Sequence, residues 1–207
     1  MGLSLNTTTG KVVASLALVG TAAGVAGLGT YGAFTSSTSA STDVASGTVA
    51  ISLGASGAAN RLSVAATGLV PGDTVQRAVT LTNATGNQSV SAITLTTLAT
   101  ATSKLDTDLA LGLQLAIDKC SVPWTEAGTA PAYTYTCSGG SVTQVLASRS
   151  VIGADLALAG LSSTAAGNTD NLRVTLSLPG AADNSFQAKS SSIDLSFTGT
   201  QRSGASK

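Results

Sequence analysis

The sequence contains no histidine, few aromatic residues and few charges. Its 207 residues include ten basic and ten acidic side chains, so that 10% of residues are charged, and 3% are aromatic. Without histidine the chain cannot form a Ser-His-Asp triad, a Cys-His pair or an H-E-x-x-H zinc helix. Sparse, balanced charge provides no basic footprint for nucleic acid or an anionic membrane surface. We therefore expect no nucleic-acid partner and no cofactor, and the composition argues against an enzyme.

The N-terminal segment resembles an export signal. Lys11 is the only charged residue before Asp43, and the apolar run 12–29, rich in Gly and Ala, follows it. One basic residue, an apolar stretch and small residues near a cleavage point are typical of a secretory signal peptide. A retained transmembrane helix and a buried helix of the domain are the alternatives. We predict a helical signal peptide, contact with the membrane only through it, and a secreted, extracellular or cell-surface location.

The two cysteines fit an oxidising compartment. Cys120 and Cys137 bracket "CSVPWTEAGTAPAYTYTC", a loop that contains Pro and Gly. Their spacing differs from the C-x-x-C of redox and metal sites, and we predict a structural disulfide. In the chain-entropy model, closing this loop stabilises the fold by about 3 kcal/mol.

Apolar and polar residues alternate along much of the chain. The clearest alternating stretches are 48–53, 111–118, 172–178 and 193–198, and further candidate strands are 61–66, 74–83, 89–98, 133–137 and 155–161. Each alternation predicts a strand with one buried and one exposed face. Turn sequences separate them, such as "PGD" at 71–73 and "PGAADN" at 179–184. We predict an all-β fold, a jelly-roll-like antiparallel β-sandwich of about nine strands with a core of Ala, Val, Leu and Ile.

A few residues could carry a binding function. Asp106 and Asp108, in "KLDTDLALG", are weak candidates for calcium ligands, although solvated carboxylates are the commoner outcome, and residues 104–110 could form one helical turn. Trp124, Tyr133 and Tyr135 lie in the disulfide loop, where exposed rings could bind a glycan or cover the edge of the core. Arg77 falls on the apolar side of its strand and should extend to solvent or pair with an acid.

Four blocks in order carry a family resemblance. They are "GTYGAFTSSTSAS" with "ASGTVAISL", "GLVPGDTVQRAVTLTNATGNQSVSAITL", "DNLRVTLSLP" and "NSFQAKSSSIDLSFTGTQ". They resemble the TasA/camelysin (CalY) family of secreted bacterial proteins, which are exported with a SipW-type signal peptidase. Two residues depart from the family pattern: Gly32 replaces the usual Ala before the cut, and Ala188 replaces a usual Gly. The disulfide loop is absent from the best-known members.

The resemblance implies boundaries along the chain. Signal cleavage would fall between Gly32 and Ala33, which makes 1–32 the removed signal peptide and 33–46 a flexible N-terminal arm. The β-sandwich domain would span 47–201, and a disordered tail 202–207. The candidate assembly arm consists of Thr35, Ser36, Ser37, Thr38, Ser39, Ser41, Thr42, Asp43 and Val44.

The resemblance also implies a function, since family members form extracellular fibres of biofilm matrix. We expect a secreted structural subunit whose arm adds a β-strand to the open sheet edge of another copy. Its partners would be copies of itself and, during export, the signal peptidase. A disordered tail is the alternative for the arm. A cell-surface metalloendopeptidase, a description given to some members, and a glycan-binding or adhesion module are the alternatives for the protein.

Overall fold

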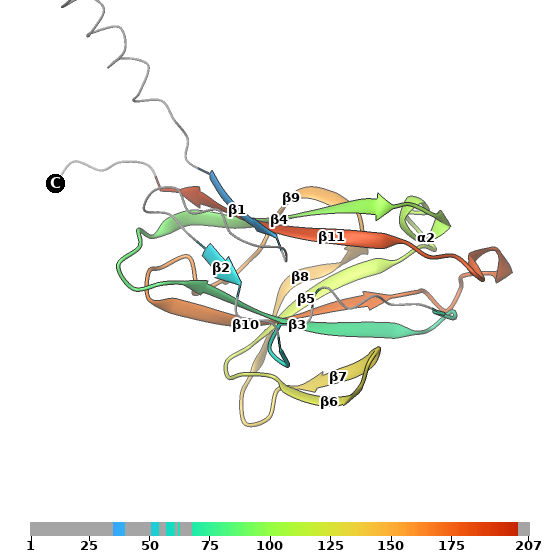
Figure 1. Cartoon of the computed structure of the whole chain (residues 1–207), viewed down its shortest axis with the longest axis horizontal. Helices are drawn as coiled ribbons and strands as arrows, with labels where there is room; N and C mark the ends of the chain where they lie inside the picture. Colours follow the sequence, from blue (N-terminus) through green and yellow to red (C-terminus); the bar gives the residue numbers. More distant parts are fainter. Residues whose placement is uncertain (1–34, 40–50, 54–56, 61, 63–67, 203–207) are drawn as a thin grey trace, which may run out of the picture. The chain divides into compact units, whose positions relative to one another are not determined.

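The computed structural model describes residues 35–39, 51–53, 57–60, 62 and 68–202. These residues fold as an all-β sandwich, which confirms the predicted fold class. Two β-sheets lie face to face, and a hairpin lies outside one of them (Figure 1).

The strands of the two sheets are all antiparallel to their neighbours. In the described residues, the four-stranded sheet has the order β1 (Thr35–Ser39), β11 (Ser192–Gln201), β4 (Val90–Ala101) and β9 (Gly153–Ala157). The five-stranded sheet has the order β2 (Ile51–Leu53), β3 (Thr74–Asn83), β10 (Asn168–Ser177), β5 (Gln114–Cys120) and β8 (Val142–Ser150). The hairpin pairs β6 (Thr125–Thr129) with β7 (Ala132–Thr136).

The order of the strands is that of a jelly roll. If the short β2 and the hairpin are set aside, eight strands remain, and consecutive strands cross from one sheet to the other except at β5 and β8. The first and last of these strands, β1 and β11, are neighbours, as are β3 and β10 in the other sheet. This arrangement of two interleaved Greek keys confirms the predicted jelly roll.

The core lies between the sheets and consists mainly of aliphatic side chains. Strand β3 contributes Val79 and Leu81, and β4 contributes Ile93 and Leu95, all at most 2% exposed. Alternate residues of these strands point the other way, as period-two side-chain geometry requires. Phe186 and Phe197 are the largest of the fully buried side chains in the described part of the chain.

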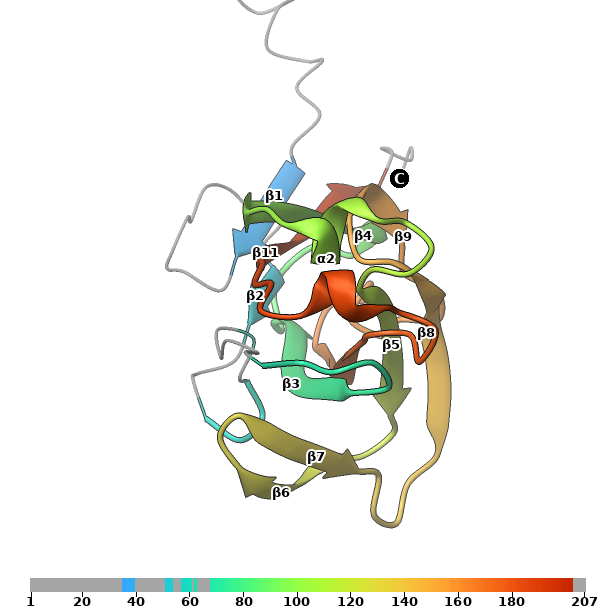
Figure 2. The ribbon, with the colours of Figure 1, turned by 90° about the vertical axis from the view of Figure 1, so that its right-hand side faces the viewer.

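Short helical turns close one end of the sandwich (Figure 2). Helix α2 (Lys104–Thr107) connects β4 to β5, and the 3-10 helix η1 (Asn184–Phe186) connects β10 to β11. The helical turn predicted within 104–110 is therefore confirmed. Of the 155–161 candidate only Asp155–Ala157 falls in a strand, and 111–113 precede β5 instead of beginning it. Most of the 61–66 candidate lies outside the described residues.

Candidate functional sites

The part of the predicted arm that the structure describes is an edge strand. Residues Thr35–Ser39 form β1, which pairs antiparallel with one end of β11, from Thr35 opposite Thr200 to Ser39 opposite Ser196. Among the described strands β1 has this one neighbour, so it forms an edge of the four-stranded sheet. The same residues that the sequence assigned to an arm therefore occupy a position where strands can be added or exchanged.

Several predicted residues lie outside the described part of the chain. These are the cleavage pair Gly32 and Ala33, and the arm residues Ser41, Thr42, Asp43 and Val44. Among the residues that the structure does describe, no helix is long and apolar enough to cross a membrane.

Asp106 is used to cap helix α2. Its carboxylate accepts hydrogen bonds from the Ser103 backbone N–H at 2.6 Å and from the hydroxyls of Thr102 and Ser191 at 2.6 and 2.5 Å. Burial raises the pKa of Asp106, but these hydrogen bonds lower it by more than burial raises it, so the pKa lies below its ordinary value. The carboxylate thus joins α2 to the segment before β11, which is a structural role.

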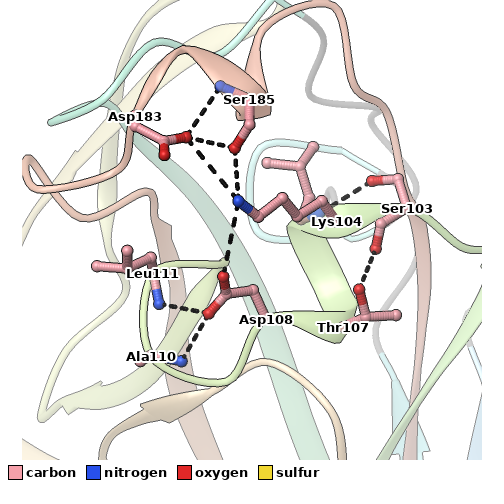
Figure 3. A network of polar contacts seen from close by, with 9 residues as sticks. Ser103, Lys104, Thr107, Asp108, Ala110, Leu111, Asp183 and Ser185 are labelled. Carbon is pink, nitrogen blue, oxygen red and sulfur yellow. Dashed lines mark hydrogen bonds and ion pairs between the residues drawn. The ribbon is translucent and has the colours of Figure 1, made fainter.

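Asp108 belongs to a separate network around Lys104 (Figure 3). The Asp108 carboxylate accepts from the backbone N–H groups of Ala110 and Leu111, and lies 4.0 Å from the Lys104 ammonium. That ammonium also donates to the Ser185 hydroxyl and lies 3.9 Å from Asp183, so it connects α2 with η1. In the described residues no group of three or more His, Cys, Asp or Glu side chains gathers in one place.

The predicted disulfide is present. Cys120, the last residue of β5, is bonded to Cys137, which directly follows β7, and their Cα atoms are 5.7 Å apart. The bond attaches the end of the β6–β7 hairpin to the five-stranded sheet. The sequence predicted the bond but gave no indication of what the hairpin contacts.

The aromatic residues of the loop pack the hairpin against the sheet. Tyr135 is 3% exposed and its hydroxyl donates to the Glu126 carboxylate at 2.7 Å. The Trp124 N–H donates to the Asn171 backbone oxygen at 3.0 Å, and Arg173 stacks on its ring. The polar groups of both rings are therefore already hydrogen-bonded within the protein. This favours the interpretation that these rings cover the edge of the core over the interpretation that they bind a glycan.

Arg77 is buried beside the hairpin. It is 4% exposed, its Nη1 donates to the backbone oxygens of Gln76 and Pro131, and its guanidinium lies 5.8 Å from the Tyr133 ring centre. The prediction that it extends to solvent is therefore wrong, because the hairpin covers it. The sequence showed no sign that a hairpin 54 positions later would supply these partners.

An ion pair between a half-buried lysine and a buried aspartate joins β5 to β10, and sequence reasoning missed it. The Lys119 Nζ is 3.3 Å from the Asp170 carboxylate, and the two side chains are 18% and 1% exposed. Asp170 also accepts from the Ser163 backbone N–H at 2.7 Å, and Lys119 donates to the Gly160 carbonyl. The pair thus closes the loop that connects β9 to β10. The available signal was Asp170, which lies two residues before Leu172 and so continues the apolar alternation of the predicted strand 172–178 with a charge.

Comparison with known proteins identifies a family. The sequence model of the family described as camelysin metallo-endopeptidase matches residues 5–123, which is more than half of the chain. The match includes β1 to β5 and ends before the hairpin. No curated protein matches the chain.

Proposed function

The chain belongs to the camelysin metallo-endopeptidase family, and from this premise we propose that it is an exported cell-surface or extracellular structural subunit that assembles with copies of itself. In this proposal, β1 of one copy adds to the four-stranded sheet of another copy. The observation that carries it is the position of β1 at a sheet edge, next to β11. The predicted signal peptide and the disulfide support export.

The composition of β1 suits strand exchange. Thr35–Ser39 reads TSSTS and contains neither a charge nor an apolar residue. Its pairing with β11 therefore depends on backbone hydrogen bonds, which any copy of the same strand can make in the same register. An incoming β1 would replace the β1 of the acceptor without changing the ladder, so pairing within a chain and pairing between chains compete for one edge.

Engineered disulfides can separate the two kinds of pairing. Ser37 lies opposite Thr198, and the described cysteines are both already paired, so added thiols would be the reactive ones. We would mix Ser37→Cys protein with Thr198→Cys protein, allow assembly and oxidise. Pairing between chains predicts a covalent dimer of the two variants in the assembled fraction, since partners across a ladder are close enough to bridge.

Control variants and two further experiments test the proposal. Replacing Thr198→Cys by Thr175→Cys, which lies on β10 of the other sheet, should abolish the cross-link. A cross-link that forms only when Ser37→Cys and Thr198→Cys are in one chain would contradict exchange. Deletion of residues 36–45 should abolish fibres in negative-stain electron microscopy, and unchanged fibres would remove the arm from the mechanism. N-terminal sequencing of the secreted protein would test cleavage before Ala33.

The family description favours one second candidate, a metalloendopeptidase. This chain would have to supply metal ligands without histidine. Incubation of the purified mature protein with casein, with and without a chelator, tests the candidate directly. Cleavage of casein that the chelator abolishes would establish metal-dependent proteolysis. If the variants Asp106→Asn and Asp108→Asn still cleave casein, the metal is bound by ligands other than these two carboxylates.

A further inference from the structure

The β6–β7 hairpin is anchored to three neighbouring strands of the five-stranded sheet, each by a different contact. The anchor on β5 is covalent, because Cys120 is bonded to Cys137. Next to it, the Ser121 backbone N–H donates to the Ser141 carbonyl at 3.0 Å, and the Ser141 N–H donates to the Ser121 hydroxyl at 3.0 Å. These two bonds continue the β5–β8 pairing by one residue across the base of the loop that carries the hairpin, so the disulfide itself is the anchor on β5.

The anchor on β10 is made by Trp124 and Arg173. Trp124 donates to the Asn171 carbonyl at 3.0 Å, and its ring lies 4.5 Å from the Arg173 guanidinium. Arg173 donates from Nη1 to the Tyr135 carbonyl at 3.1 Å and from Nη2 to the Asp118 carboxylate at 2.7 Å. One side chain of β10 thus holds both β7 and β5.

The contacts with β3 extend from β7 to the turn of the hairpin. The Tyr135 backbone N–H donates to the Gln76 side-chain oxygen at 2.9 Å, and Arg77 donates to the Pro131 carbonyl at 3.1 Å. Since β3, β10 and β5 are consecutive in the sheet, the three anchors run across the strands. Contacts in this direction resist the separation of one strand from the next.

Residues 74–80 of β3 pair with a strand on one side only in the described structure, as the edge strand β8 does. Among the described strands, β10 pairs with β3 along its whole length, whereas β2 pairs only with residues Leu81–Asn83. Residues 74–80 therefore have one strand partner in the described structure, and strands held on one side open more readily. Gln76 and Arg77 both lie in this segment.

We propose that the hairpin is a strap, a disulfide-anchored element that holds residues 74–80 of β3 against β10 and limits their local opening. This role is independent of assembly, so it is tested on the monomeric mature protein. A disulfide that acted only through the entropy of the unfolded chain would change the global stability and would not single out one strand. Hydrogen exchange followed by mass spectrometry distinguishes the two, because it measures opening segment by segment.

The decisive variant is Cys120→Ser/Cys137→Ser, compared with Leu95→Ala. Leu95 is a fully buried residue of β4 in the other sheet, so its truncation destabilises the fold without touching the strap. In the cysteine variant we expect peptides covering 74–80 to exchange about tenfold faster or more, while peptides of β4 and β11 change less than about threefold. In Leu95→Ala the four-stranded sheet should be affected at least as much as β3. Uniform acceleration in the cysteine variant, or none in β3, would overturn the proposal.

A milder variant keeps the proposal testable if the cysteine variant fails to fold. Gln76→Ala leaves the disulfide and the core in place but removes the acceptor of the Tyr135 N–H. Exchange should then accelerate in β7 and in 74–80 and nowhere else. Unchanged exchange in both segments would contradict the strap.

Discussion

The guanidinium of Arg173 lies 4.5 Å from the centre of the Trp124 ring, and this stack joins strand β10 to the loop that leads into the hairpin. The guanidinium is at the same time the donor to Asp118 and to the Tyr135 carbonyl. Arginine is suited to this position because its planar group can stack and donate in its own plane at once. The stability of the hairpin should therefore depend on this side chain more than on any exposed charge.

Replacement of Arg173 by Met should lower the free energy of unfolding by about 2 kcal/mol. The variant loses a charge-assisted hydrogen bond and a second bond to a carbonyl, while Met keeps part of the packing on Trp124. Urea denaturation gives the loss, and Trp124, the single tryptophan, should show a red-shifted emission in the folded state. Arg149→Met on β8 is the matched control, because Arg149 is exposed, and should change stability by less than about 0.5 kcal/mol. Equal effects of the two variants would contradict this assignment.

Lys119→Met should destabilise the protein by about 3 kcal/mol. The substitution leaves the Asp170 carboxylate buried without its cation, and removal of one partner of a buried pair is costly because the remaining charge is not compensated. Lys189→Met is the control for loss of an exposed lysine and should be nearly neutral. Chemical denaturation at pH 7 measures both. A Lys119→Met protein as stable as the parent would show that the pair contributes nothing net.

Stability should fall in acid as buried carboxylates are protonated. Burial raises the pKa values of Asp106 and Asp170, but hydrogen bonds lower them by more, so both lie below the ordinary value. The donors to Asp106 are Ser191, Thr102 and Ser103. The donor to Asp170 is Ser163, and the charge of Lys119 also lowers the pKa of Asp170. Each of these carboxylates has a folded-state pKa below its unfolded value of about 4. Its contribution to the stability of the protein is therefore present above the unfolded pKa and is lost as the pH falls through the folded-state pKa.

The variant Asp106→Asn tests this sign. It should be less stable than the parent by about 1.5 kcal/mol at pH 7, because the charged acceptor is gone. The difference should shrink as the pH falls below the unfolded value of about 4 and through the lower folded-state pKa of Asp106, because the parent carboxylate is then protonated too. Thermal unfolding measured from about pH 7 into this acid range gives both curves. A difference that stays constant with pH would show that Asp106 does not contribute through its charge.

Local alternation predicted some strands well and failed where pairing is irregular. The predicted strand at 74–83 coincides with β3, which is paired without interruption to β10. Strand β8 was missed because its alternation breaks at Val145 and Leu146, where the register with β5 shifts. An irregularity of this kind is fixed by two strands together and leaves no period in either one.

The site contacts were the least predictable part. The disulfide followed from the spacing of two cysteines and the expected compartment, but Lys119 and Asp170 meet only because β5 and β10 are neighbours in the sheet. Pairing between strands about 50 positions apart depends on the whole jelly roll. The arm is an intermediate case: its polar composition argued for a segment outside the core, and its position beside β11 came from the structure.

Ala188→Gly should stabilise the protein by about 0.5 kcal/mol. Ala188 has a φ of 54°, in the left-handed region where a Cβ costs roughly 1–2 kcal/mol. It stands where the family resemblance has a glycine, which would adopt this conformation freely. Glycine also makes the unfolded chain more flexible, which lowers stability by about 0.4–1 kcal/mol, so the net gain is small but positive.

The control is Ala181→Gly, an exposed alanine of the segment before η1 that is not among the residues with positive φ. It should lose stability, because only the unfolded-state effect remains. Thermal unfolding of the two variants beside the parent measures the difference, and a loss of stability in both would show that the left-handed backbone at 188 carries no cost.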